Sequence, residues 1–189
     1  MKKISITILF LLLGLVVKAQ EDITLYRLMN KQYTAGGLLA LQHNTVTNKA
    51  ILIQPEGVKF DVKTGYLQAL IIKQVKNKDG VVFICSLKNK DYFLKYNEAG
   101  NFSFAKMDKT KQANFMWEVN YAGPKKDGIL NEDLVYLSPK IKSSLSIVNE
   151  NGELKLTPIF DKNGVKVDKK KSKLADKFIF YLQKMNNAL

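Results

Sequence analysis

The stretch DYFLKYNEAGNFSFAK, residues 91–106, decides the fold because the chain repeats its pattern. Two runs of alternating apolar residues flank the turn NEAG, and residues 144–157, SLSIVNENGELKLT, have nearly the same layout. Gly100 and Gly152 close the two turns, and glycine readily adopts the left-handed backbone that a short hairpin loop needs before its second strand. The alternation after each glycine predicts a strand with one face toward a core. The sequence therefore predicts two equivalent β-hairpins.

A shift of 52 residues aligns the two copies without a gap. It superposes Gly100 on Gly152 and also matches apolar positions outside the turns. The matched pairs are Val82 with Leu134, Phe93 with Leu145, Phe102 with Leu154, and Phe104 with Leu156. A third, weaker copy lies upstream, where TLYRLM at 24–29 resembles DLVYLS at 133–138. The chain thus contains three units of about 50 residues each.

Each unit is predicted to end in an aromatic strand. The three strands are VKFDV at 58–62, FMWEV at 115–119 and FIFYL at 178–182. This alignment makes Phe60, Trp117 and Phe180 equivalent, and Trp117 is expected to fill the core rather than to stack on a sugar. Three four-stranded units predict an all-β, pseudo-threefold barrel, because repeated hairpins bury their apolar faces by closing together.

The hairpins followed by aromatic strands resemble the β-trefoil superfamily. The resemblance is carried by YFLKYNEAGNFSFAK with NFMWEV and by SLSIVNENGELKLT with KFIFYL, and it covers most of residues 22–183. This superfamily includes ricin-type lectins, fascin-like domains and fibroblast-growth-factor-like proteins, so the resemblance implies binding through the barrel loops. Ricin-type repeats usually carry a Gln-x-Trp signature, and the corresponding strands here lack that glutamine. The ricin-type sugar site is therefore not carried over to this sequence.

The end of the chain leaves a second architecture open. Residues 174–187 can be written as an amphipathic helix, with apolar residues at about every 3.6 positions. Alternation through Phe178, Phe180 and Leu182 predicts a strand equally well. A helix would favour a lipocalin-like β-barrel that holds a small ligand inside, whereas a strand would complete the trefoil.

The N-terminus has the layout of a secretory signal peptide. Two lysines precede an apolar run at 4–17, and Ala19 lies where a signal peptidase cuts. The run is shorter than the roughly 20 residues needed to span a bilayer. We therefore predict cleavage after Ala19, a single β-trefoil domain at 20–189, and no transmembrane segment after cleavage. The expected location is secreted or periplasmic.

The chain is strongly basic, with a net charge of +13 that falls to +10 on cleavage, because residues 1–19 hold three lysines and no acid. Lysine supplies almost all of this charge, since Arg27 is the one arginine. The densest basic segment lies in the third unit and is predicted to bind anionic polysaccharide or another acidic surface. The residues of this anion-binding patch are Lys169, Lys170, Lys171 and Lys173. No aromatic residue interleaves them, which argues against base stacking and disfavours nucleic acid as a partner.

Candidates for catalysis are scarce. Cys85 is the only cysteine and lies in an apolar run, so we expect a buried, inert thiol and no disulfide. His43 is the only histidine and lies in the polar stretch LQHNTVTN, so we expect a surface turn residue. These two residues are too few for a Cys/His zinc site, and no nucleophile–base pair or phosphate loop is recognisable. We predict a protein that is not an enzyme and uses no metal or cofactor.

Recognition of a sugar needs a flat aromatic face beside hydrogen-bonding groups. The loop tyrosines that could supply this face are Tyr33, Tyr66, Tyr92 and Tyr121. The densest polar group surrounds one of them, and we predict a carbohydrate-binding site at Asp91, Tyr92 and Asn97. The sequence thus predicts an exported, non-catalytic protein that binds carbohydrate or a cell-surface glycan. The alternatives are a protein-binding module, such as a protease-inhibitor-like trefoil, and a small-ligand-binding β-barrel.

Overall fold

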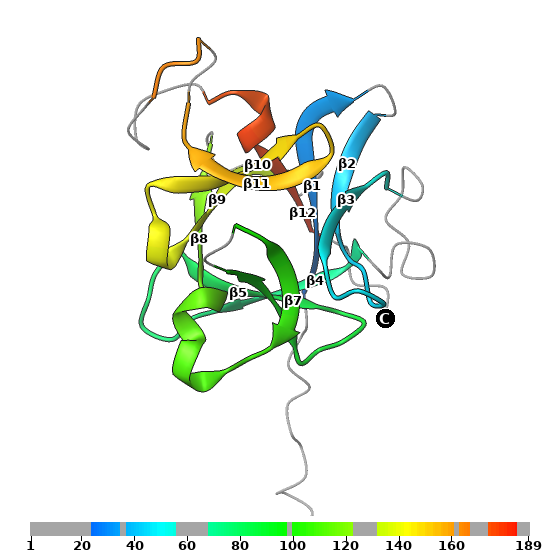
Figure 1. The fold of residues 1–189 in the computed structure, drawn as a ribbon, viewed down its shortest axis with the longest axis vertical. Helices are drawn as coiled ribbons and strands as arrows, with labels where there is room; N and C mark the ends of the chain where they lie inside the picture. Colours follow the sequence, from blue (N-terminus) through cyan, green and yellow to red (C-terminus); the bar gives the residue numbers. More distant parts are fainter. Residues whose placement is uncertain are drawn as a thin grey trace, which may run out of the picture.

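The computed structural model describes residues 24–34, 37–55, 68–97, 100–122, 132–160, 163–166 and 174–184, which are mostly strands joined by turns (Figure 1). The strands are β1 (Leu25–Thr34), β2 (Gly37–His43), β3 (Ala50–Ile53), β4 (Leu70–Gln74), β5 (Val81–Ser86), β6 (Tyr92–Tyr96), β7 (Phe102–Lys106), β8 (Trp117–Tyr121), β9 (Glu132–Pro139), β10 (Leu145–Glu150), β11 (Glu153–Pro158) and β12 (Phe180–Lys184). The 3-10 segments of the same residues are η2 (Lys109–Phe115), η3 (Lys140–Lys142) and η4 (Asp176–Phe178). The predicted signal peptide at 1–19 lies outside the described residues.

Six of the described strands pair in a closed antiparallel ring. The order of pairing is β1–β12–β9–β8–β5–β4, and β4 pairs again with β1. The other described strands form the hairpins β2–β3, β6–β7 and β10–β11, which Figure 1 shows arranged around a common centre. A ring capped by three hairpins, with four strands in each of three repeats, is a β-trefoil. The predicted all-β fold and its threefold repeat are confirmed.

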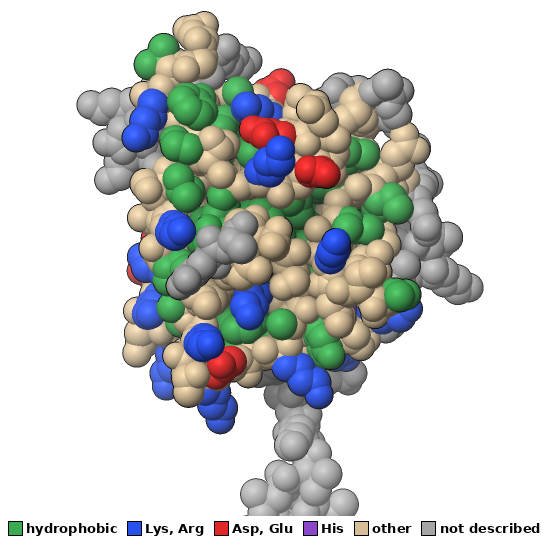
Figure 2. Space-filling model, viewed as in Figure 1, with side chains coloured by type: hydrophobic (Ala, Val, Ile, Leu, Met, Phe, Trp, Pro, Cys, Tyr) green, Lys and Arg blue, Asp and Glu red, His purple; other side chains and the backbone are tan. Residues whose placement is uncertain are grey.

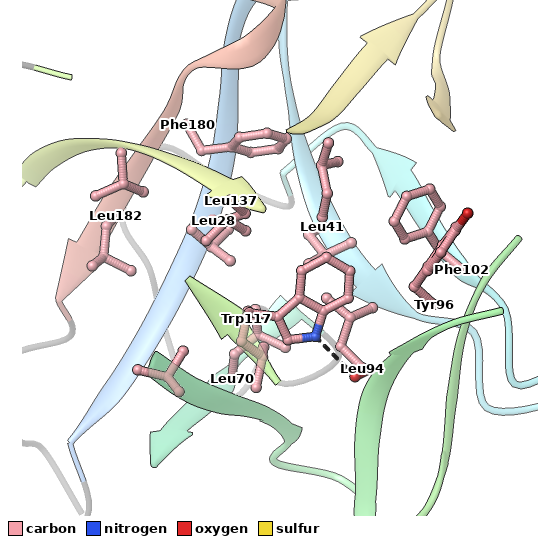
Figure 3. Packing of buried hydrophobic residues seen from close by; sticks show 14 of the residues in the cluster. Leu28, Leu41, Leu70, Leu94, Tyr96, Phe102, Trp117, Leu137, Phe180 and Leu182 are labelled. Carbon is pink, nitrogen blue, oxygen red and sulfur yellow. Dashed lines mark hydrogen bonds between the residues drawn. The ribbon is translucent and has the colours of Figure 1, made fainter. Parts of the chain in front are cut away.

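Pairing in the ring identifies three equivalent buried residues, Leu70, Trp117 and Phe180. Each of them pairs with two strands, the first strand of its own repeat and the first strand of the next repeat. In every such first strand, the partner from the preceding repeat and the partner from the same repeat contact positions that are four residues apart. The indole N–H of Trp117 donates to the carbonyl oxygen of Leu94 at 3.0 Å (Figure 3), which confirms Trp117 as a core residue. The expected third member, Phe60, lies outside the described residues. Leu70 occupies its place, because the position is defined by burial between two paired strands rather than by an aromatic ring.

The inside of the ring is filled by side chains (Figure 3). Its buried members include Leu28, Leu70, Val82, Trp117, Val135, Leu137, Phe180 and Leu182. At the end of the chain, residues 176–184 form η4 and β12 rather than a long helix. The strand interpretation is therefore the observed one. A packed interior without a terminal helix over these residues is a trefoil and not the lipocalin-like alternative.

From the first hairpin to the third, each turn is one residue shorter than the turn of the hairpin before it. The strands before the turns repeat every 53 residues, at Leu41, Leu94 and Ile147. The strands after the turns repeat every 52 residues, at Ala50, Phe102 and Leu154. The gap-free shift of 52 is thus wrong by one residue for the strands before the turns, where it aligned Phe93 with Leu145. It is also wrong for Val82, which it aligned with Leu134, because the ring pairing makes Val82 equivalent to Val135. A slip of one residue exchanges the two faces of a strand, and it is Leu94, not Phe93, that enters the main core.

Predictions about two single residues have opposite outcomes. Cys85 is fully buried, as expected, and burial raises the pKa of its thiol to about 11. His43 is also fully buried, which corrects the expectation of a surface turn residue. Its ring stacks on that of Phe104, with 4.5 Å between the centroids. A residue beside a turn is buried when a neighbouring hairpin packs over it, and the local sequence does not report that neighbour.

Candidate functional site

A cleft of about 490 Å³ lies where the three hairpins meet. Its apolar lining includes Ala50, Phe102 and Leu154, which occupy equivalent positions at the starts of β3, β7 and β11. These side chains pack onto the main core, so the bottom of the cleft is continuous with the interior of the barrel. Figure 2 shows hydrophobic side chains gathered in the hollow at the middle of this hairpin face. The pseudo-threefold axis of the fold therefore ends in an open cleft.

The residue before each of these apolar positions gives the cleft a polar group. Lys49, Asn101 and Glu153 are equivalent in the three repeats, but they carry an ammonium, an amide and a carboxylate. Within the described residues, neither Lys49 nor Glu153 forms an ion pair. Ser103 adds a hydroxyl next to Lys49, because a β-bridge joins these two residues. A symmetric backbone thus presents an asymmetric set of hydrogen-bonding groups.

Asn97 also lines the cleft, and the turn of the second hairpin fixes it. Its side-chain oxygen accepts from the backbone N–H of Asn101 at 2.9 Å. Its backbone N–H donates to the Asn101 carbonyl at 3.1 Å, and its carbonyl accepts from Gly100 at 3.0 Å. Gly100 has a φ of 85°, which is the left-handed conformation predicted for the glycine of this turn. The side-chain NH₂ group of Asn97 is left as a fixed donor at the edge of the cleft.

The predicted carbohydrate-binding group of Asp91, Tyr92 and Asn97 does not come together. Tyr92 begins β6 and Asn97 follows its end, so at the usual rise of a strand they are about 16 Å apart. Tyr92 is half-buried and its ring packs against His43, with 5.7 Å between the centroids. Asp91 is exposed in the turn before β6. The structure therefore brings Asn97 alone of these three to the cleft.

Other predicted residues lie elsewhere. Among the loop tyrosines, Tyr121 is 49% exposed at the end of β8, and Tyr66 lies outside the described residues, as does the side chain of Tyr33. The predicted anion-binding patch also lies outside the described residues; it comprises Lys169, Lys170, Lys171 and Lys173. Tyr121, the one of these residues whose side chain the structure describes apart from Tyr92, does not line the cleft between the hairpins.

The sequence analysis missed four polar residues of the cleft, Lys49, Asn101, Ser103 and Glu153. A signal for two of them was present, because Asn101 and Glu153 each follow the glycine that closes a predicted hairpin turn. Lys49 could be found only with the correct register of the first hairpin. What could not be inferred is that three hairpin ends, each about 50 residues from the next, converge on one axis.

The cleft contains few groups that perform acid–base chemistry. Glu153 is the one carboxylate among its lining residues, whereas glycoside hydrolysis usually uses a pair. Across the described ranges, no group of three or more His, Cys, Asp or Glu side chains could hold a metal ion. The same residues contain no helix with the length and apolar character needed to cross a membrane.

Comparison with known proteins places the chain by fold. No family model matches it, and no curated protein matches it in sequence. Solved structures do match. The designed threefold-symmetric protein ThreeFoil has a TM-score of 0.52 and 14% identity, over 84% of this chain and 97% of its own. SeviL, solved bound to the asialo-GM1 saccharide, has a TM-score of 0.52 and 14% identity, over 85% of this chain and 96% of its own.

A larger protein also contains this fold. The GlcNAcα1-4Gal-releasing endo-β-galactosidase from Clostridium perfringens matches with a TM-score of 0.56 and 16% identity, over 86% of this chain. The chain spans about a third of that enzyme's length. At these identities the similarity establishes the β-trefoil fold.

Proposed function

We propose that the protein is a non-catalytic carbohydrate-binding β-trefoil, and that the sugar occupies the cleft between the three hairpins. The observation that carries this proposal is the cleft's composition. An apolar bottom is surrounded by converging amide, hydroxyl, carboxylate and ammonium groups. A volume of about 490 Å³ lies within the range of small-molecule sites, which combine apolar lining with a few directional polar groups.

The polar groups suit a polyhydroxylated ligand. The carboxylate of Glu153 can accept hydrogen bonds from two hydroxyl groups, and the amides of Asn97 and Asn101 can donate to ring or hydroxyl oxygens. Lys49 could accommodate an acidic group on the sugar, and the net charge of the chain would raise the rate of encounter with an anionic glycan. Phe102 is only 5% exposed, so the cleft offers an apolar bottom rather than a free aromatic face.

Proteins of similar fold support the proposal at the level of architecture. SeviL was solved with a saccharide bound, and the Clostridium perfringens enzyme is named for its action on a glycan. Export of the chain by a cleaved signal peptide belongs to the same proposal, because cell-surface glycans lie outside the cytoplasm.

A glycan array tests the proposal. The chain from Gln20 onward would be applied at about 0.15 M salt and again at about 0.5 M, where exposed charges are strongly screened. Binding that survives the higher salt and is weakened by Asn101→Ala supports a directional site in the cleft. Binding that disappears at the higher salt would indicate that glycans are attracted by the charge of the lysine segment at 169–173 and not bound in the cleft. No binding at either salt contradicts the carbohydrate proposal.

A further inference from the structure

A second cleft, of about 400 Å³, lies on the other side of the third hairpin turn. Its lining residues are Gln32, Thr34, Leu39, Asn149, Asn151 and Gly152. None of these residues carries a charge, in contrast to Lys49 and Glu153 in the cleft between the hairpins. The lining offers amide and hydroxyl groups that both donate and accept hydrogen bonds. This cleft, called the side cleft below, is thus suited to an uncharged, hydrogen-bonding group.

Buried hydrogen bonds build the wall of the side cleft. Asn149 is 1% exposed; its side-chain NH₂ donates to the side-chain oxygen of Asn30 at 3.1 Å, and its own oxygen accepts from the backbone N–H of Gly152 at 2.8 Å. The pairing of β1 with β2 shifts register between Asn30 and Thr34. Such irregularities redirect side chains beside functional sites. Here the shifted segment contributes Gln32 and Thr34 to the cleft.

Gln32 supplies the observation that points to a ligand. Its side-chain oxygen is buried and has no hydrogen-bond partner in the described part of the chain. A buried acceptor without a partner costs free energy, so such groups in native structures usually have a reason. Gln32 lines the cleft while this oxygen is covered by its neighbours, so a ligand hydroxyl would supply the missing partner once the Gln32 amide turns its oxygen toward the cleft.

The two clefts meet at Gly152, which lines both of them. A Cβ atom placed on Gly152 would have no atom within 4 Å, so the space above the turn is open. We infer that the protein binds an extended glycan that enters the cleft between the hairpins and continues over Gly152 into the side cleft, where an uncharged sugar unit donates a hydroxyl to Gln32. This inference rests on the proposed function and adds a ligand length and a second site to it.

The test is the dependence of affinity on ligand length. Calorimetric titrations would use galacto-, cello- and chitooligosaccharides of one to six units with the wild type, with Gln32→Ala and with Gln112→Ala as matched control. Gln112 is exposed on η2 and lines neither cleft. In the series that binds, affinity should rise with length and then level off once both clefts are filled. Gln32→Ala should lose about 3- to 10-fold for the long members, as expected for one hydrogen bond, and little for the shortest.

The possible results distinguish failure of the second site in the side cleft from failure of carbohydrate binding as a whole. Equal affinity for all lengths, or a Gln32→Ala variant that matches Gln112→Ala throughout, overturns the side cleft as a second site and leaves the first cleft standing. An equal loss for short and long members also overturns it, because a general disturbance of the fold would act on both. Failure of every member to bind the wild type overturns the proposed function and this inference with it.

Discussion

The side chain of Asn149 donates to the side-chain oxygen of Asn30 at 3.1 Å, although 119 residues of chain separate them. Both residues are at most 1% exposed. Asn30 also donates to the carbonyl oxygens of Lys177 and Ile179, at 3.0 and 3.2 Å. This amide pair therefore connects the first strand, the third hairpin and the segment before the last strand in one buried network.

Removal of either amide should destabilise the fold. Asn149→Ala and Asn30→Ala each leave a buried partner without its hydrogen bond, and each should lower the free energy of unfolding by about 1–3 kcal/mol. The double variant should cost less than the sum by about 1 kcal/mol, because the two share one interaction. Urea unfolding measures all three values, with the exposed Asn101→Ala as control. Strict additivity would show that the two amides do not interact in solution.

Trp117 should be the most sensitive of the three equivalent barrel residues. Trp117→Phe removes the donor to the Leu94 carbonyl and leaves unfilled volume in a fully buried site. We expect a loss of about 2–4 kcal/mol in the free energy of unfolding. Circular dichroism during urea unfolding measures it, since the chain has no other tryptophan to report by fluorescence. Tyr121→Phe, at an exposed ring, should change the value by less than about 0.5 kcal/mol.

His43 should make stability fall in mild acid. Burial lowers the pKa of His43 from its ordinary value of about 6.5, the nearby Lys88 charge acts in the same direction, and the hydrogen bond to Asn48 opposes them. The folded state thus favours the neutral ring, which makes stacking contacts with Tyr92 and with Phe104. Because the unfolded chain binds the proton more readily, the contribution is complete above pH 6.5 and is lost as pH falls through the folded pKa.

The measurement compares urea midpoints between pH 7 and pH 5 for the wild type and His43→Asn. Asparagine occupies the equivalent position of the third repeat, at Asn149. The wild-type midpoint should decline more steeply over this range than that of the variant. Parallel curves would mean that carboxylates elsewhere, and not His43, determine the acid response.

Cys85 should resist thiol reagents while the protein is folded. The S–H group donates to the carbonyl oxygen of Lys90 at 2.8 Å, and with a pKa of about 11 only about one thiol in a thousand is ionised at pH 8. Labelling with a disulfide reagent should therefore follow the rate of global unfolding and become fast and stoichiometric in concentrated urea. Fast labelling without denaturant would indicate that β5 opens locally.

The two charged residues of the cleft, Lys49 and Glu153, should affect acidic and neutral ligands differently. Lys49→Gln should weaken binding of acidic sugars by about 5- to 10-fold and leave neutral ones nearly unchanged, because a charge-assisted hydrogen bond is lost only for the former. Glu153→Gln should weaken neutral and acidic sugars alike, since the hydroxyl acceptor is impaired. The glycan array reports both, with Lys76→Gln in the turn after β4 as the charge-matched control for Lys49→Gln. Equal losses for Lys49→Gln and Lys76→Gln would reduce the role of Lys49 to general attraction.

The sequence predicted those parts of the fold that depend on local pattern. Alternation and a closing glycine identified the hairpins around Gly100 and Gly152, and the repeat identified Trp117 and Phe180 as equivalent. The pattern was wrong where an aromatic residue was used to identify the last strand of a repeat. In the first repeat this position is held by Leu70, which is not aromatic. It also failed by one residue in the strand that contains Phe93, since the register of a hairpin depends on the length of its turn.

The site depends on convergence that no local pattern reports. Lys49, Asn101 and Glu153 are ordinary hairpin residues when taken singly, and they form one cleft only because the ring brings their turns to a common axis. The opposite holds for the predicted group around Tyr92. Its members are close in sequence, but a strand of five residues separates Tyr92 from Asn97.

Because β1 pairs with β12, the ring of strands does not itself determine where the chain begins. Tyr26 lies opposite Lys184, so the strand that opens the first repeat and the strand that closes the third are immediate neighbours. A circular permutant that connects these strands and opens the chain in the turn between β4 and β5 would keep every pairing of the ring. The position at which the chain starts is therefore separable from the architecture of the ring.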